Sequence, residues 1–109
     1  MKRLMRMTLV LLAVCSLVLL SACGPKVDYR SAEAVEKALN AGEKLDGKIG
    51  RVKVNKVTDS GLGYVAEAGE HLNFYSVNDP MIKDGSTITV RIDTATNLLG
   101  VWMITYTKV

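Results

Sequence analysis

The feature that most limits the fold is a series of short segments with alternating apolar residues, which fills the chain from residue 51 onward. The clearest is Thr87–Ile92, with an aliphatic residue at every second position. Arg51–Asn55 also alternates, and Lys56–Val57 then shifts phase, as a β-bulge would make it do. The other segments are 64–68, 71–76 and 101–107. Five short strands separated by turn residues predict a small barrel or a strongly bent sheet.

One segment before the strands has helical periodicity. Ser31 can cap a helix over Ser31–Gly42, and Gly42 offers a left-handed stop. A narrow apolar stripe around Val35 and Leu39 predicts that this helix lies against the strands. The expected fold is therefore mainly β with one N-terminal helix.

Three cationic residues lie among the first six of the chain, and its only long apolar run follows them. Residues 7–20 are fourteen in number and are broken only by Thr8, Cys15 and Ser16. A membrane-spanning helix needs about 20 apolar residues, whereas this length suits the apolar region of a secretory signal. We expect residues 1–22 to be a signal peptide that is removed.

The end of that run, Leu20-Ser21-Ala22-Cys23, resembles the lipobox of bacterial lipoproteins. The resemblance implies that the Cys23 sulfur receives a diacylglycerol and that the new N-terminus is acylated, commonly with palmitate. Two or more acyl chains hold a protein stably on a membrane. An uncleaved anchor is the alternative, whereas a Cys15–Cys23 disulfide would need a cysteine from the discarded signal. Residues 23–29 would then be a lipidated tether for a domain over residues 30–109.

The charge of the chain changes when the signal is removed. The whole sequence has 14 Lys and Arg against 11 Asp and Glu, and the three excess cations, Lys2, Arg3 and Arg6, all precede Cys23. Residues 23–109 therefore carry no net charge. A strongly basic surface for nucleic acid is not indicated, although a local patch could exist.

Residues 36–109 resemble the small bacterial lipoproteins whose exported part is an OB-fold-like domain related to anticodon-binding modules. The matching segments are Ala38-Leu39-Asn40 with Gly42, Val52-Lys53-Val54-Asn55, Gly69-Glu70-His71-Leu72-Asn73-Phe74, Lys83-Asp84-Gly85 and Leu99-Gly100-Val101-Trp102. The resemblance implies a small five-stranded OB-like barrel and supplies no catalytic motif. Residues 77–86 are too few for the helix that often joins the third and fourth strands, so the N-terminal helix would plug the barrel instead.

Chemically reactive side chains are few, and we expect no enzyme, no cofactor and no metal site. His71 is the only histidine. Its neighbour Glu70 would point to the opposite face of a strand, so a general base would have no orienting carboxylate. Asp79 and Asp84 lack the alternating oxygens of a calcium loop. Phe74 and Trp102 are expected in the core, because a small domain needs its large apolar groups there.

The best candidate binding surface combines cationic and aromatic side chains of the first three strands, with a solvated outer face as the alternative. Its members are Arg51, Lys53, Lys56, Tyr64, His71 and Tyr75. The predicted function is a non-catalytic, lipid-anchored binding module for a protein or an envelope polymer. Single-stranded nucleic-acid binding outside the cell is the alternative, and an envelope hydrolase that uses His71 is a third hypothesis.

The predicted location follows from the lipid on Cys23. The protein would be held as a monomer on the extracytoplasmic face of the cell membrane. In a cell with two membranes, Gly24 in place of an aspartate after the cysteine favours the outer membrane.

Overall fold

Five strands of this protein close into a barrel, in which the first strand along the chain pairs with both the second and the fourth, and the fifth lies between the third and the fourth. The computed structural model describes residues 26–109, so the predicted signal peptide and Cys23 lie outside the described residues. The elements are α2 (Ala32–Asn40), β1 (Ile49–Asp59), β2 (Tyr64–Ala68), β3 (Leu72–Ser76), β4 (Thr87–Leu98) and β5 (Val101–Lys108).

The strand pairing is that of an OB-like barrel, as predicted. The strands β3 and β5 are parallel, and the other neighbouring pairs are antiparallel. The first half of β1 pairs with β4 and its second half pairs with β2. A register shift between Val54 and Lys56 separates the two halves, which confirms the predicted bulge. A bulge bends its strand, so one long strand can belong to both sides of the barrel.

The barrel interior is filled by the side chains that alternate inward along each strand. Phe74 is completely buried, as predicted, and its ring meets the Tyr106 ring edge to face with the centroids 5.6 Å apart. The other fully buried large side chains are Leu45, Leu72, Ile92, Ile104, Val35, Val52, Val54 and Val90. Burial of such side chains contributes about 1.5–3 kcal/mol each and is the main force that closes a barrel of this size.

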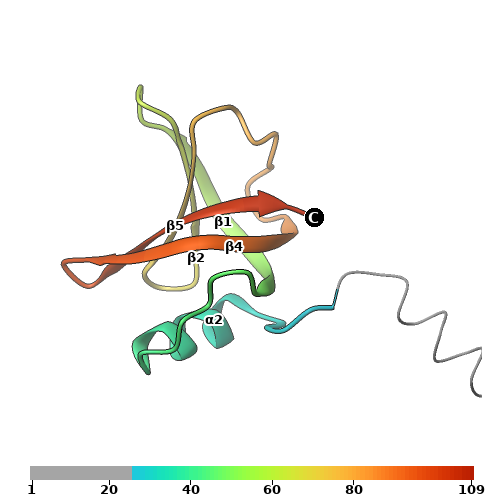
Figure 1. Cartoon of the computed structure of the whole chain (residues 1–109). Helices are drawn as coiled ribbons and strands as arrows, with labels where there is room; N and C mark the ends of the chain where they lie inside the picture. The colour runs from blue at the N-terminus through green and yellow to red at the C-terminus, as the bar shows by residue number, and fades with distance from the viewer. Residues whose placement is uncertain (1–25) are drawn as a thin grey trace, which may run out of the picture.

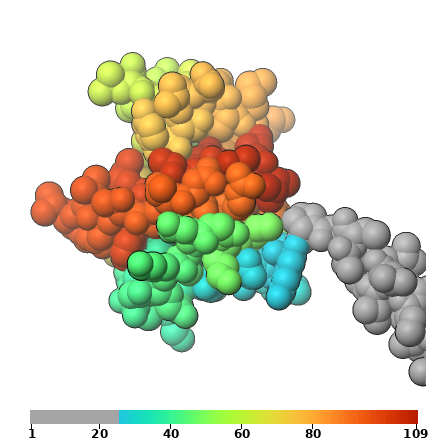
Figure 2. All heavy atoms as spheres, in the orientation of Figure 1, coloured from blue at the N-terminus to red at the C-terminus, as the bar shows by residue number. Residues whose placement is uncertain are grey.

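The helix α2 closes one end of the barrel (Figures 1 and 2). Its N-cap Ser31 accepts a hydrogen bond from the Ala34 amide, and its apolar stripe joins the barrel core. Val35 lies against Gly50, where a side chain would meet it at 3.2 Å. At the other end of the helix, the half-buried Trp102 donates its indole N–H to Asn40 Oδ1 at 2.9 Å. The segment 77–86 contains no helix. The buried side chains of α2 belong to the barrel core instead, so α2 is the plug that the sequence predicted.

The boundaries of two strands, β3 and β4, differ from the predicted ones. Glu70 and His71 lie in the β2–β3 turn, and β3 begins only at Leu72. The strand β4 continues to Leu98, well beyond the expected end at residue 92, and forms a long hairpin with β5 (Figure 1).

Among residues 26–109, no helix is both long enough and apolar enough to cross a membrane.

The chain before α2 is attached to the barrel. Asp28 and Tyr29 donate backbone hydrogen bonds to the Ile49 carbonyl, and Arg51 donates one to the Tyr29 carbonyl. The Asp28 side chain also accepts a hydrogen bond from the Ile49 amide at 2.9 Å. The last two residues of the predicted tether are therefore fixed beside the start of β1.

Candidate functional site

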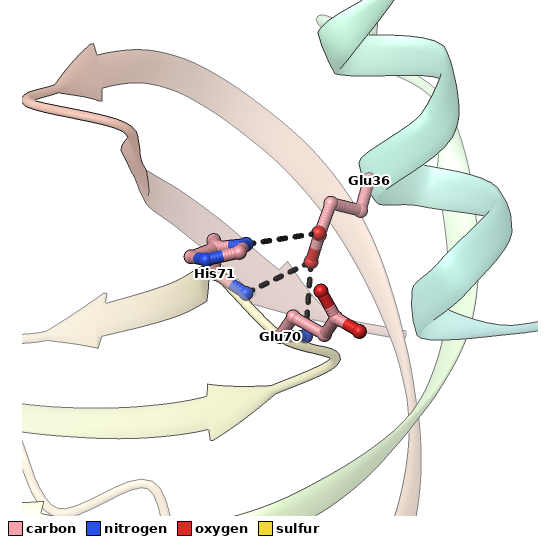
Figure 3. A group of neighbouring side chains, drawn as sticks. All are labelled: Glu36, Glu70 and His71. Carbon is pink, nitrogen blue, oxygen red and sulfur yellow. Dashed lines mark hydrogen bonds and ion pairs between the residues drawn. The ribbon is translucent and has the colours of Figure 1, made fainter.

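The Glu36 carboxylate connects α2 to the β2–β3 turn (Figure 3). Its Oε1 accepts hydrogen bonds from the backbone amides of Glu70 at 3.0 Å and His71 at 2.9 Å. Its Oε2 lies 3.2 Å from His71 Nδ1. Both carboxylate oxygens are thus occupied by one short turn, which fixes the orientation of the group.

The local sequence explains why helix and turn can approach so closely. Val35 and Leu39 are buried in the barrel, so Glu36 lies at the margin of the helix face that meets the β2–β3 turn, with only 12% of its side chain exposed. Gly69 begins the turn with φ of +57°, and a β-carbon there would lie 2.9 Å from Glu36 Oε1. Glycine is therefore favoured at position 69, both for its backbone angle and for the room it leaves beside Glu36.

The surroundings of Glu36 favour its ionised form. Partial burial raises the pKa of this carboxyl, but the hydrogen bonds from His71 and Glu70 and the nearby imidazole outweigh burial, so the pKa lies below its ordinary value of 4.5. Glu36 and Glu70 form no ion pair with any lysine or arginine among residues 26–109. Within the described part of the chain, His71 is therefore the one basic side chain at ion-pair distance from Glu36.

Three ligand-type residues meet at this point. One ligand atom each from Glu36, Glu70 and His71 lies within 4.8 Å of the other two. The expectation that Glu70 points away from His71 was wrong in its premise, because both residues belong to a turn and not to a strand. The carboxylate that orients His71 is Glu36, which is 35 residues away in the sequence.

A second feature is a surface hollow of about 350 Å³ beside the first turn of α2. Three cationic side chains line it, and none of them forms an ion pair within the described part of the chain. The lining residues are Arg30, Ser31, Ala32, Glu33, Arg51, Lys53, Asn55, Gly69, Glu70 and Thr87. We call this feature the cationic hollow.

The predicted binding residues divide between several places. Arg51 and Lys53 lie together in the cationic hollow, on the half of β1 that pairs with β4. Lys56 follows the bulge and lies opposite Glu67 of β2. His71 belongs to the Glu36 cluster instead.

The two predicted tyrosines lie on different sides of the sheet. Tyr75 lies on β3 opposite Val65, and its hydroxyl donates to the Leu62 carbonyl at 2.7 Å. Tyr64 is half-buried and, by the alternation of β2, lies on the same side as the buried Ala66. The structure therefore does not bring the six predicted residues together into one surface.

Sequence reasoning missed Glu36 and Arg30 as site residues. Nothing in the sequence around Glu36 shows that the backbone of a turn 34 residues later donates a hydrogen bond to its carboxylate. Arg30 was placed at the boundary between tether and domain. Its closeness to Arg51 and Lys53 arises from the bridge between Tyr29 and Gly50, which is also a long-range contact.

Comparisons with known proteins add no relative. None of the protein-family models, curated proteins or solved structures compared with this chain matches it. The OB-like architecture is accordingly established by the strand order and pairing of the barrel itself.

Proposed function

We propose that this protein is a non-catalytic, lipid-anchored binding module on the outer side of a bacterial membrane, and that it holds an anionic polymer of the cell envelope. The observation that carries the choice of ligand is the cationic hollow, where Arg30, Arg51 and Lys53 gather without an ion-pair partner among residues 26–109. Cationic side chains that face one groove attract and retain a chain of negative charges.

The local charge of the hollow supports an anionic ligand. Its three cations outnumber the two acids that line it, Glu33 and Glu70. The first turn of α2 belongs to the lining, and the N-terminal end of a helix favours negative charge. Because residues 23–109 have no net charge, affinity for a polyanion has to come from such a local arrangement.

The predicted lipid supports the location of the ligand. Residues 28 and 29 are fixed beside β1, so the preceding residues 24–27, which span about 14 Å when fully extended, set how far the domain reaches from an acylated Cys23. Arg30, at the end of this tether, lines the hollow. An anchored protein would therefore hold the hollow close to the membrane surface, where envelope polymers begin.

The surroundings of His71 favour binding over catalysis. Its Nδ1 faces Glu36, and no serine, threonine or cysteine side chain is hydrogen-bonded to it within residues 26–109. A histidine and a carboxylate without a positioned nucleophile supply only part of a hydrolytic centre.

The anchor is tested by fatty-acid labelling of cells that produce the wild type or Cys23→Ala. Label in the wild type alone, together with an intact mass that lacks residues 1–22, is the expected result. Equal labelling of both proteins would exclude the lipid anchor.

The ligand is tested by titration with a synthetic glycerol-phosphate polymer. The Arg51→Ala/Lys53→Ala variant should bind roughly tenfold more weakly at low salt, since two exposed ion pairs of about 0.7 kcal/mol each together contribute about 1.4 kcal/mol. Affinity of the wild type should fall with salt, with a logarithmic slope of roughly −2 for three contacts.

The matched control is Lys44→Ala/Lys83→Ala, which removes the same charge from exposed residues outside the hollow. Equal weakening by both double variants would show that only total charge matters. A single-stranded oligonucleotide of equal charge is the second ligand to titrate. Tighter binding of the oligonucleotide than of the glycerol-phosphate polymer would show that nucleic acid, and not an envelope polymer, is the preferred ligand.

A further inference from the structure

We infer that Glu36, Glu70 and His71 form a binding site for a divalent transition-metal ion of the zinc type, which joins α2 to the β2–β3 turn. This site lies beside the cationic hollow and goes beyond the proposed binding of a polyanion. It would give the protein a metal-dependent link between the plug helix and the barrel.

The spacing of the ligand atoms suits such an ion. Zinc binds histidine nitrogen and carboxylate oxygen at about 2.0–2.2 Å, so two ligands of a tetrahedral ion lie about 3.3–3.5 Å apart. Glu36 Oε2 and His71 Nδ1 are already 3.2 Å apart. The third ligand atom, from Glu70, lies within 4.8 Å of both, and the exposed Glu70 side chain makes no hydrogen bond among residues 26–109 that would hold it away.

The charge of the cluster also favours a cation. Two carboxylates lie side by side (Figure 3), and no lysine or arginine pairs with either of them within the described residues. Like charges at this separation repel one another, and an ion placed between them would convert the repulsion into attraction. The half-exposed His71, with 53% of its side chain accessible, leaves the position open to solvent.

Glu36 and His71 are held in place before any ion binds. Glu36 is fixed by the backbone amides of Glu70 and His71, so these hydrogen bonds act as the outer shell that orients a metal-binding carboxylate. His71 and Glu70 are consecutive residues of a turn that Gly69 allows. Binding of an ion would therefore require little further ordering of the chain.

The ligand types indicate the class of ion. One imidazole nitrogen with two carboxylate oxygens suits zinc and its neighbours in the first transition row, whereas calcium takes six to eight oxygen ligands. Three protein ligands leave one position of a tetrahedral ion for water or for a ligand atom of a partner. On binding, His71 would offer the Nδ1 lone pair and carry its single ring proton on Nε2.

The test uses the untagged full-length chain, with both cysteines replaced by serine so that no thiol competes for the metal. Zinc is added while heat release and the ring-nitrogen NMR signals of His71 are recorded. The expected result is one ion per chain, a shifted Nδ1 signal, and a melting temperature that rises with zinc concentration. Magnesium and calcium should give none of these changes.

Three variants test the individual ligands. His71→Ala, Glu70→Gln and Glu36→Gln should each weaken zinc binding by at least about tenfold, the loss that even outer-shell partners cause. Glu70→Gln is the most informative because the exposed Glu70 side chain makes no hydrogen bond or ion pair among residues 26–109. The exposed Glu43→Gln is the control and should bind like the parent chain. Absence of a shifted His71 signal, or unchanged affinity in Glu70→Gln, would overturn the three-ligand site.

Discussion

Gly63 is the residue at which a single added carbon has the most direct consequence. It precedes β2 with φ of +152°, and the Tyr75 ring covers it. A β-carbon there would lie 2.6 Å from Tyr75 Cε2 and 2.8 Å from the Ser76 carbonyl oxygen. The β1–β2 turn can therefore lie flat on β3 only because this position has no side chain.

The first prediction compares two glycines of that turn. Gly63→Ala should lower the free energy of unfolding by about 3 kcal/mol, because overpacking and backbone strain add. Gly61 also has positive φ, +82°, but open space around it, so Gly61→Ala should cost only about 1 kcal/mol. Urea denaturation of both variants measures the difference. Equal losses would mean that the contact with Tyr75 does not constrain the turn.

The second prediction concerns two tyrosine hydroxyls in opposite situations. The Tyr106 hydroxyl is buried without a hydrogen-bond partner among residues 26–109, whereas the Tyr75 hydroxyl donates to Leu62. Tyr106→Phe should raise the free energy of unfolding by about 1 kcal/mol, because an unsatisfied polar group is removed. Tyr75→Phe makes the same chemical change and should lower it by about 1 kcal/mol.

The Tyr106 effect should grow in alkali. Burial raises the pKa of Tyr106 above its ordinary value of 10.0, so the unfolded chain ionises first as the pH rises. The free energy of unfolding of the wild type is therefore unaffected by this ionisation below pH 10.0, and it falls as the pH rises from there through the folded-state pKa. Tyr106→Phe has no such group, so its advantage over the wild type should increase. Urea denaturation at neutral pH and above pH 10 checks both effects. A Tyr106→Phe variant less stable than the wild type would contradict the prediction.

At the scale of elements, the β4–β5 hairpin combines a tight turn with an unusual residue. Leu98 pairs with Val101, so Leu99 and Gly100 form a two-residue loop with φ of 56° and 90°. Two positive angles define a turn of type I′, which prefers Asn-Gly. Leu99 adopts a left-handed conformation that costs a residue of its kind roughly 1–2 kcal/mol, while its side chain is fully exposed.

The third prediction is that Leu99→Asn stabilises the protein. The free energy of unfolding should rise by about 1 kcal/mol, because asparagine tolerates positive φ and no packing is lost. Leu98→Asn is the control: it makes the same change at an exposed strand position without positive φ, and it should be neutral or destabilising. Thermal melting of both variants distinguishes relief of strain from a simple gain in polarity.

The elements that could be predicted are those specified by neighbouring residues. The cap at Ser31, the stop near Gly42 and the bulge before Lys56 are local signals, and each lies where it was expected. The second half of β4 was missed because it is polar and exposed, with no inward alternation to reveal it. His71 was misplaced for a different reason, since the contact that shapes its turn comes from Glu36 on a distant helix.

At the scale of the whole molecule, the two proposed sites share one residue. Glu70 lines the cationic hollow with Arg51 and Lys53, and it is also the third ligand of the proposed metal site. Its negative charge opposes a polyanion in the hollow. A divalent cation bound to Glu70 would replace this repulsion of the polyanion by attraction. Binding of the metal should therefore raise the affinity for the polymer, and binding of the polymer should raise the affinity for the metal.

The fourth prediction is therefore a positive coupling between the two ligands. Saturating zinc should raise affinity for the glycerol-phosphate polymer by about fivefold, at the lower end of measured couplings, and the polymer should raise zinc affinity by the same factor. Calorimetric titration of each ligand in the presence of the other measures both values. Glu70→Gln should bind the polymer more tightly than the wild type without zinc, because the opposing charge is gone.

The control for this coupling separates the protein site from the polymer's own affinity for zinc. The His71→Ala variant keeps the cationic hollow but lacks a metal ligand, so its affinity for the polymer should not respond to zinc. An equal response of His71→Ala and wild type would mean that zinc acts on the polymer phosphates. Zinc that binds without changing polymer affinity would show that the two sites are independent, because a coupling free energy must be visible from either ligand.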